Sequence, residues 1–223
     1  WSFTVEGWDT YYACTAATAG DVNGDGYADL IVGAPYANNR TGTVHLFYGS
    51  AWGLDAPLLD ISGEADYDEF GSSIATAGDV NGDGFADILV GAPKVAWNDA
   101  GKAYLYYGSS AGIRVDQEPW TYERENANYL GHQIAGAGDV NGDGYADVLI
   151  STDTDGYYTG SIHLQRGNDG GGRLALARQT RGDGSRIPVQ PWGRSTTDSF
   201  AVSINALNPL GRGKARMQVQ ACP

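Results

Sequence analysis

A ten-residue segment rich in oxygen-bearing side chains occurs three times in the sequence. It reads GDVNGDGYAD at residues 20–29, GDVNGDGFAD at residues 78–87 and GDVNGDGYAD at residues 138–147. Each copy holds three aspartates and one asparagine at the same spacing. Without a cation, carboxylates this close together would repel one another and some would protonate. The repeated concentration of negative charge therefore indicates cation sites.

The spacing of these side chains suits calcium. Oxygen-bearing side chains fall at positions 1, 3, 5 and 9, and the glycine after position 5 permits a sharp turn that brings the carbonyl of position 7 inward. Six or more oxygen ligands in a flexible loop are what Ca²⁺ prefers. We therefore expect about three Ca²⁺ ions, one per loop. The predicted ligands are Asp21, Asn23, Asp25, Tyr27 (carbonyl), Asp29, Asp79, Asn81, Asp83, Phe85 (carbonyl), Asp87, Asp139, Asn141, Asp143, Tyr145 (carbonyl) and Asp147.

The loops begin like an EF-hand but cannot close like one. An EF-hand needs a bidentate glutamate at position 12 and a helix on each side. Position 12 is Val32, Val90 or Ile150 here, each within an apolar run. The loop must instead close at position 9 and lie in a β-hairpin. The alternative is that these segments are Asx-type turns that hold no metal.

No other set of residues forms a recognisable catalytic motif, so we predict no catalytic residues and a non-enzymatic protein. His45, His132 and His163 belong to no nucleophile or zinc motif, and the matching strand positions of His45 and His163 favour a packing role. Carboxylate pairs for acid–base chemistry occur only inside the loops, where calcium would keep them ionised.

Predicted strands surround each loop. A run of small residues precedes it (CTAATAGD, SSIATAGD, HQIAGAGD), and an aliphatic run follows it (LIVGAP, ILVGAP, VLISTD). The third strand alternates and ends at a glycine (GTVHLFYG, GKAYLYYG, GSIHLQRG), and PLLDISG and EPWTYER read as fourth strands. Four strands in a period of about sixty residues are typical of a β-propeller blade.

The composition favours the same all-β architecture, because 33 glycines and 14 tyrosines suit turns and strands. We predict three four-stranded blades in residues 1–172, with the chain starting mid-blade because WSFTVEG resembles the last strand PLLDISG. Residues 173–223 form either a divergent fourth blade or a separate small β-unit. That segment carries eight basic and two acidic residues within a chain of net charge −13.

The charge and the cysteine content of the chain limit its possible partners and its cellular compartment. The acidic majority would repel nucleic-acid phosphates, and no apolar run is long enough to insert into a membrane. Cys14 and Cys222 are the only cysteines, which fits one disulfide in an oxidising compartment, with two buried free thiols as the alternative. The chain begins at Trp1, which suggests a processed or excised product.

The repeats resemble the FG-GAP repeats that form the β-propeller of integrin α subunits. The second repeat carries both halves of the motif, Phe70-Gly71 before its loop and Gly91-Ala92-Pro93 after it. The first repeat keeps Gly-Ala-Pro at residues 33–35, and the third has Leu-Gly at residues 130–131 but Ser-Thr-Asp at residues 151–153. The resemblance covers roughly residues 1–172.

The resemblance implies a calcium-stabilised adhesion or recognition surface on a secreted or cell-surface protein. The partner would be a protein or a glycan. The alternative functions are an accessory or scaffold part of an extracellular hydrolase, and a partial propeller that a homo-oligomer completes between chains.

Overall fold

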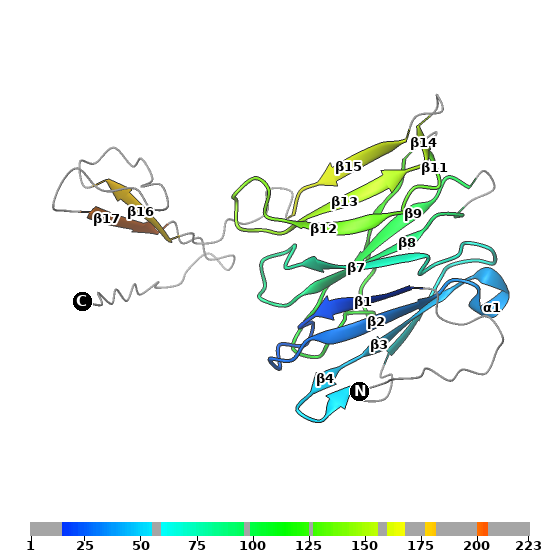
Figure 1. Cartoon of the computed structure of the whole chain (residues 1–223), viewed down its shortest axis with the longest axis horizontal. Helices are drawn as coiled ribbons and strands as arrows, with labels where there is room; N and C mark the ends of the chain where they lie inside the picture. Colours follow the sequence, from blue (N-terminus) through cyan, green and yellow to red (C-terminus); the bar gives the residue numbers. More distant parts are fainter. Residues whose placement is uncertain are drawn as a thin grey trace. The chain divides into compact units, whose positions relative to one another are not determined.

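The structure is a computed structural model that describes residues 15–54, 59–95, 99–124, 127–155, 160–167, 177–181 and 200–204 (Figure 1). The chain divides into two compact units, Trp1–Val140 with Tyr145–Gly167, and Asn141–Gly144 with Asn168–Pro223. Cys14, Cys222 and the strand predicted at residues 1–7 lie outside the described residues. The predicted domain boundary at residue 172 stays a prediction.

The first unit is built from antiparallel sheets whose strands follow one another along the chain. The first sheet is β1 (Thr15–Gly20), β2 (Asp29–Ala34), β3 (Thr43–Phe47) and β6 (Leu59–Ser62). The second is β7 (Ser73–Gly78), β8 (Asp87–Ala92), β9 (Lys102–Tyr106) and β10 (Trp120–Tyr122). The third is β12 (Ile134–Gly138), β13 (Asp147–Thr152) and β15 (Ser161–Gln165). This order confirms the predicted all-β propeller fold, and the three sheets are called blades 1, 2 and 3 below.

Short elements complete the described chain. The strands β4 (Gly49–Ser50) and β5 (Gly53–Leu54) form a short hairpin. β11 (Ala127–Asn128) pairs with β14 (Thr154–Asp155), and β12 and β13 lie between them in the chain. In the second unit β16 (Ala177–Arg181) pairs with β17 (Phe200–Ile204). The one-turn element α1 (Ala37–Arg40) is not a regular helix, because Asn38 and Asn39 have φ values of 53° and 58°. No helix in the described part of the chain is long and apolar enough to cross a membrane.

The three blades share the same irregularity at the start of the aspartate loop. The pairing of the first two strands shifts register between Thr18 and Gly20, between Thr76 and Gly78, and between Gly136 and Gly138. Each shift leaves one residue of the first strand unpaired, as in a β-bulge, and bulges bend and re-aim a strand. The loop therefore leaves the sheet at the same place in every blade.

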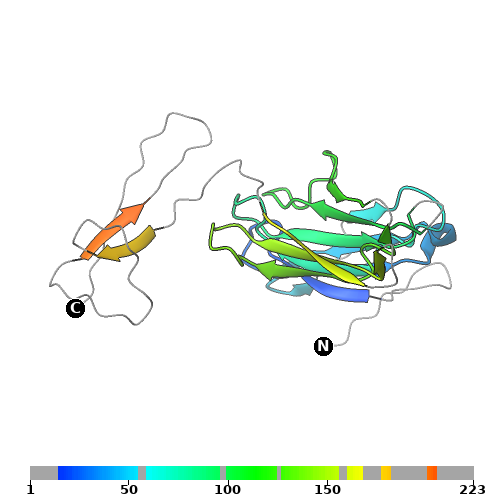
Figure 2. The ribbon, with the colours of Figure 1, turned by 90° about the horizontal axis from the view of Figure 1, so that it is seen from above.

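Successive blades pack face to face, with the first strands β1, β7 and β12 adjacent in turn (Figures 1 and 2). The core between blades 1 and 2 centres on Phe70, whose ring meets the rings of Tyr104 and Tyr106 edge-on. The core between blades 2 and 3 includes Leu89, Leu105 and other fully buried aliphatic side chains. Each blade thus buries an apolar face only against its neighbour, as propeller blades do.

Glycine at the start of the Gly-Ala-Pro motif lets the backbones of adjacent blades touch. A Cβ on Gly91 would lie 2.1 Å from the carbonyl oxygen of Gly131, and one on Gly33 would lie 2.2 Å from that of Gly71. The same carbonyls accept hydrogen bonds from the hydroxyls of Ser73 (2.6 Å) and Thr15 (2.8 Å) respectively. The motif is therefore an inter-blade contact.

Blade 3 exposes the face that blades 1 and 2 bury. Ile162 and Leu164 of β15 are 73% and 44% exposed, whereas the matching Ala103 and Leu105 of β9 are 0% and 2% exposed under blade 3. Ser151 stands where the earlier blades have the contact glycine. The repeat pattern of packing therefore stops at blade 3 within the described residues.

Candidate metal centres

The first strand of each blade leads into its aspartate loop, which returns along the second strand. In the first loop, Asp21 at position 1 accepts hydrogen bonds from three backbone N–H groups: Oδ1 from Gly24 (2.6 Å) and Asp25 (3.1 Å), and Oδ2 from Gly26 (2.9 Å). Asn23 Oδ1 accepts a hydrogen bond from the backbone N–H of Asp25 (3.0 Å). The loop is therefore wound around the side chain of its first aspartate.

The second loop repeats this winding, and the third loop repeats the contact between the side chains at positions 3 and 5. Asp79 Oδ1 accepts from the N–H groups of Gly82 (2.6 Å) and Asp83 (3.0 Å), and Asp79 Oδ2 accepts from Gly84 (2.9 Å). In the third loop, Asn141 Nδ2 donates to Asp143 Oδ2 over 2.9 Å, the same distance as in the first two loops. The first two loops, whose ten residues differ only at Tyr27 and Phe85, thus have closely similar hydrogen bonds.

The aspartate at position 9 is buried and held by two backbone N–H groups. Asp29 accepts hydrogen bonds from Val22 and Gly49, each over 2.8 Å, and is only 2% exposed. Asp87 and Asp147 are fully buried and accept the equivalent pairs of bonds. The second donor in each blade is the glycine two residues after the third strand, namely Gly49, Gly108 and Gly167.

These three glycines are site residues that the motif analysis missed. A Cβ on any of them would lie 2.3–2.4 Å from the carbonyl oxygen of the alanine before the position-9 aspartate. The signal in the sequence was the glycine that ends the third strand at the same place in every repeat. The position-9 aspartate therefore bonds the loop to the segment that directly follows the third strand of its own blade.

The loops also join one blade to the next. The backbone N–H of Ala86 in the second loop donates to the carbonyl of Asp21 in the first, over 3.0 Å. The N–H of Ala146 donates to the carbonyl of Asp79 over 2.9 Å in the same way. Adjacent aspartate loops are therefore joined by a backbone hydrogen bond.

The comparison with known families gives the repeats their identity. The FG-GAP repeat family matches residues 15–47, 70–106 and 130–164, each of which starts at or just before a first strand and covers the loop and the next two strands. The chain is an FG-GAP repeat protein. Its FG-GAP repeats resemble those of integrin α subunits, as predicted from the Phe70-Gly71 and Gly91-Ala92-Pro93 motifs.

The chain is similar in sequence to integrin α chains. The chain is 40% identical to integrin α-7 of Mus musculus over 139 residues, which are 59% of this chain and 11% of the relative. It is 35% identical to integrin α-3 of Cricetulus griseus over 154 residues, 65% of this chain and 14% of the relative. It is 31% identical to integrin α-5 of Xenopus laevis over 163 residues, 67% of this chain and 15% of the relative. The FG-GAP repeats thus span a small part of the length of the relatives that they match.

Burial makes the charge at position 9 costly in the first two FG-GAP repeats. Desolvation raises the pKa of Asp87 to about 7, against the lowering effect of the hydrogen bonds from Gly108 and Val80. The nearby carboxylates of Asp83 and Asp79 contribute to this rise in pKa, of which burial is the largest cause. Burial likewise raises the pKa of Asp29. A cation in the loop would favour the ionised form of both aspartates.

The donor set of the loops fits a hard cation. Every side chain at positions 1, 3, 5 and 9 offers oxygen, and Asp25 and Asp83 at position 5 are exposed. Across the part of the chain that the structure describes, no three His, Cys, Asp or Glu side chains form a preassembled metal cluster. The predicted ligands, including the carbonyls of Tyr27, Phe85 and Tyr145, stay a prediction.

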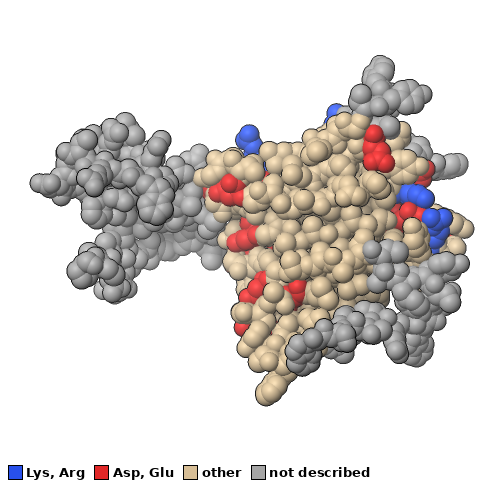
Figure 3. Space-filling model, in the orientation of Figure 1, with Lys and Arg blue, Asp and Glu red and all other residues tan. Residues whose placement is uncertain are grey.

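Acidic side chains are visible along the edge of the first unit where these loops lie (Figure 3).

The histidines lie elsewhere and have partners of their own. His45 Nδ1 lies 2.7 Å from Asp60 Oδ1, and His132 Nδ1 lies 3.2 Å from Asp153 Oδ1. His163 packs beside the ring of Tyr122. Each of these contacts is with a neighbouring strand or loop and none is with an aspartate loop.

Proposed function

We propose that the chain is a non-enzymatic recognition module for adhesion whose blades are stabilised by calcium. The observation that carries the proposal is the threefold aspartate loop, with its oxygen donors at the same positions and its backbone bonded to the next loop. Asp21, Asp79 and Asp139 begin the loops and would hold the ions together with the other predicted ligands. When bound, Ca²⁺ would supply positive charge at the point where the blades meet.

The loops would perform two tasks in this account. Their oxygen atoms would bind the ion, and the N–H to carbonyl bonds between Ala86 and Asp21 and between Ala146 and Asp79 would carry the resulting order across blades. Binding free energy would then add to folding free energy, by about 2.7 kcal/mol per site at a Ca²⁺ concentration one hundred times the Kd. The likeness to integrin α chains supports an extracellular location and a protein or glycan partner.

An attachment assay tests the recognition role. Surfaces coated with the full chain should retain cultured cells in CaCl₂ and lose them in a chelator. A variant in which Asp21, Asp79 and Asp139 are replaced by alanine should retain few cells even in CaCl₂. Equal attachment with and without calcium would contradict a calcium-dependent role, and no attachment in either condition would contradict recognition.

A second function, assembly of a larger propeller, is favoured by the uncovered face of blade 3. Ile162 and Leu164 expose apolar surface that matching side chains in blades 1 and 2 bury. Exposed apolar faces of this kind mark surfaces that bury against another element. A homo-oligomer would provide that cover between chains, and sedimentation of the full chain in CaCl₂ would then show a dimer or larger species rather than a monomer.

A further inference from the structure

A polar pocket lies at the end of blades 1–3 opposite the aspartate loops. It has a volume of about 290 Å³, and its lining includes Tyr36, Glu69, Lys94, Tyr129, His132 and Asp153. These residues follow the second strand of a blade or precede the first strand of the next one. The pocket is therefore formed by all three blades and uses none of the predicted calcium ligands.

Two pairs of residues in the left-handed backbone region shape this end of the blades. Arg40 and Glu69 have φ values of 65° and 55°, and Asp99 and Tyr129 occupy the matching repeat positions with 52° and 54°. The N–H of Glu69 donates to the carbonyl of Arg40 (2.8 Å), and that of Tyr129 donates to the carbonyl of Asp99 (2.6 Å). Non-glycine residues adopt this conformation at a cost, and such residues cluster at functional sites.

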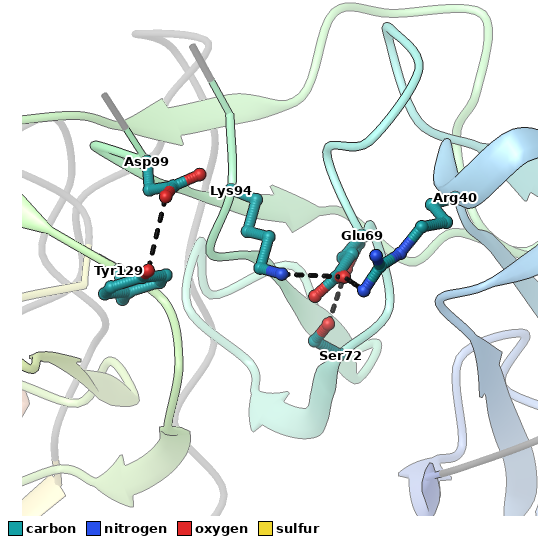
Figure 4. Close-up of polar contacts among 6 residues, drawn as sticks. All are labelled: Arg40, Glu69, Ser72, Lys94, Asp99 and Tyr129. Carbon is teal, nitrogen blue, oxygen red and sulfur yellow. Dashed lines mark hydrogen bonds and ion pairs between the residues drawn. The ribbon is translucent and has the colours of Figure 1, made fainter. Parts of the chain in front are cut away.

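The two junctions share a backbone but differ in charge. Between blades 2 and 3, the hydroxyl of Tyr129 donates to Asp99 Oδ2 over 3.2 Å (Figure 4). Between blades 1 and 2, Glu69 Oε1 accepts both Arg40 Nη2 and Lys94 Nζ, the latter over 3.0 Å (Figure 4). The repeated backbone belongs to the fold, whereas the charged cluster is particular to the first junction.

This cluster carries a surplus of positive charge. The side chain of Glu69 is 8% exposed, while those of Lys94 and Arg40 are 32% and 44% exposed. One buried carboxylate thus holds two cations, and neither cation contacts a second carboxylate among the described residues. An ammonium has three N–H donors and a guanidinium has five, so several donors remain for a ligand. Lys94 lines the pocket, and Arg40 contacts two of the lining residues, Glu69 and Tyr36.

We propose that this pocket binds the carboxylate of an acidic side chain on a protein partner. A carboxylate is the group that ammonium and guanidinium donors pair with best, and the volume suits a single side chain. The ring of Tyr36, with the Arg40 guanidinium 5.2 Å from its centre, supplies an apolar wall for the stem of that side chain. Asp153 also lines the pocket, with its Oδ1 3.2 Å from His132 Nδ1, and its negative charge is offset only when that imidazole is protonated. The inference rests on the proposed recognition function in one respect only, namely that the bound carboxylate belongs to a protein.

A titration followed by nuclear magnetic resonance tests the site. The ¹⁵N-labelled full chain, saturated with CaCl₂, is titrated with N-acetyl-aspartate amide and N-acetyl-glutamate amide, with N-acetyl-asparagine amide as the neutral control. We expect saturable shifts of the backbone signals of Lys94, Tyr129 and His132 with the acidic probes only. Equal binding of the asparagine probe, or shifts confined to other parts of the chain, would overturn the proposal.

Matched variants separate the pocket from the surface charge. Lys94→Gln should weaken binding of the acidic probes about tenfold, the effect of one lost charge-assisted hydrogen bond. Arg114→Gln removes one positive charge outside the pocket and should leave binding unchanged. Arg40→Gln is the second test if Lys94→Gln does not fold, and wild-type affinity in the folded variants would refute the site.

Two further results would identify the source of the carboxylate and separate failure of the pocket from failure of the proposed function. Tighter binding of glucuronate than of either acidic amino-acid probe would overturn the protein source and assign the carboxylate to a saccharide. Calcium uptake is measured on the same samples, because loss of probe binding with full calcium uptake rejects the pocket alone. The absence of calcium uptake by the wild-type chain would instead reject the proposed function.

Discussion

Replacement of Gly91 by alanine tests whether the Gly-Ala-Pro motif is an inter-blade contact. The new Cβ would lie 2.1 Å from the carbonyl oxygen of Gly131 and 2.3 Å from Ser73 Oγ, both of which are far inside normal contact distance. The carbonyl of Gly131 cannot yield easily, since Gly131 belongs to the backbone that enters blade 3 and its N–H donates to the carbonyl of Ser151 over 2.9 Å. Blades 2 and 3 must therefore move apart locally.

The cost follows from two contributions. Overpacking a tight contact costs about 1–3 kcal/mol. The hydrogen bond from Ser73 Oγ to the Gly131 carbonyl, 2.6 Å long and buried, contributes about 1 kcal/mol more and would be lost or stretched. The free energy of unfolding should therefore fall by about 2–4 kcal/mol, which corresponds to a decrease in Tm of roughly 4–16 °C for a chain of this size.

Urea denaturation in CaCl₂, followed by tryptophan fluorescence, measures this loss. Ser151→Ala is the matched control, because Ser151 stands at the same position of blade 3 and already carries a Cβ. It should cost about 1 kcal/mol or less, since it removes only the acceptor of the Gln133 N–H at 3.0 Å. A Gly91→Ala variant within about 0.5 kcal/mol of the wild type, the range of ordinary surface substitutions, would refute the contact.

Two other substitutions test the core and the buried charge. Phe70→Ala should lower the free energy of unfolding by about 3–5 kcal/mol in the same urea assay, because Phe70 is 1% exposed and packs against Tyr104 and Tyr106. Trp52→Ala is the control, because Trp52 is 90% exposed and its loss should change the free energy of unfolding by no more than about 0.5 kcal/mol. Equal effects of the two substitutions would contradict the packing described. Asp68 is buried, and desolvation raises its pKa above 3.8, so the folded state binds more protons than the unfolded chain and stability falls as the pH rises above that value. Asp68→Asn should reduce this fall in a series of denaturation curves from pH 4 to pH 7, and an unchanged pH dependence would show that Asp68 is not responsible.

The fold could be predicted from the sequence because its signals are local and repeated. The aspartate loop, the aliphatic run after it and the alternating third strand appear in the same order each time, and the structure has β1 to β3, β7 to β9 and β12, β13 and β15 in those places. Repetition matters physically, since each blade folds by the same local preferences and buries its face against the next.

The contacts that depend on distance in the sequence could not be predicted. The pairing of Gly49 with Asp29 and the approach of Gly131 to Gly91 join residues that only the folded blades bring together. The cluster of Arg40, Glu69 and Lys94 also escaped prediction, because its charges are 29 and 25 residues apart and match no motif. Strand patterns report which face is buried, but they do not report which side chains meet at the ends of neighbouring blades.

Calorimetric titration of the chelator-treated chain with CaCl₂ tests the central claim most directly. The account predicts uptake of about three ions by the wild-type chain and about two by Asp83→Ala. Asp83 is an exposed side chain at position 5 of the second loop and belongs to no other loop. Its replacement should leave the first and third loops able to bind. The absence of calcium uptake, or the same stoichiometry in both proteins, would contradict the assignment of the aspartate loops as calcium sites.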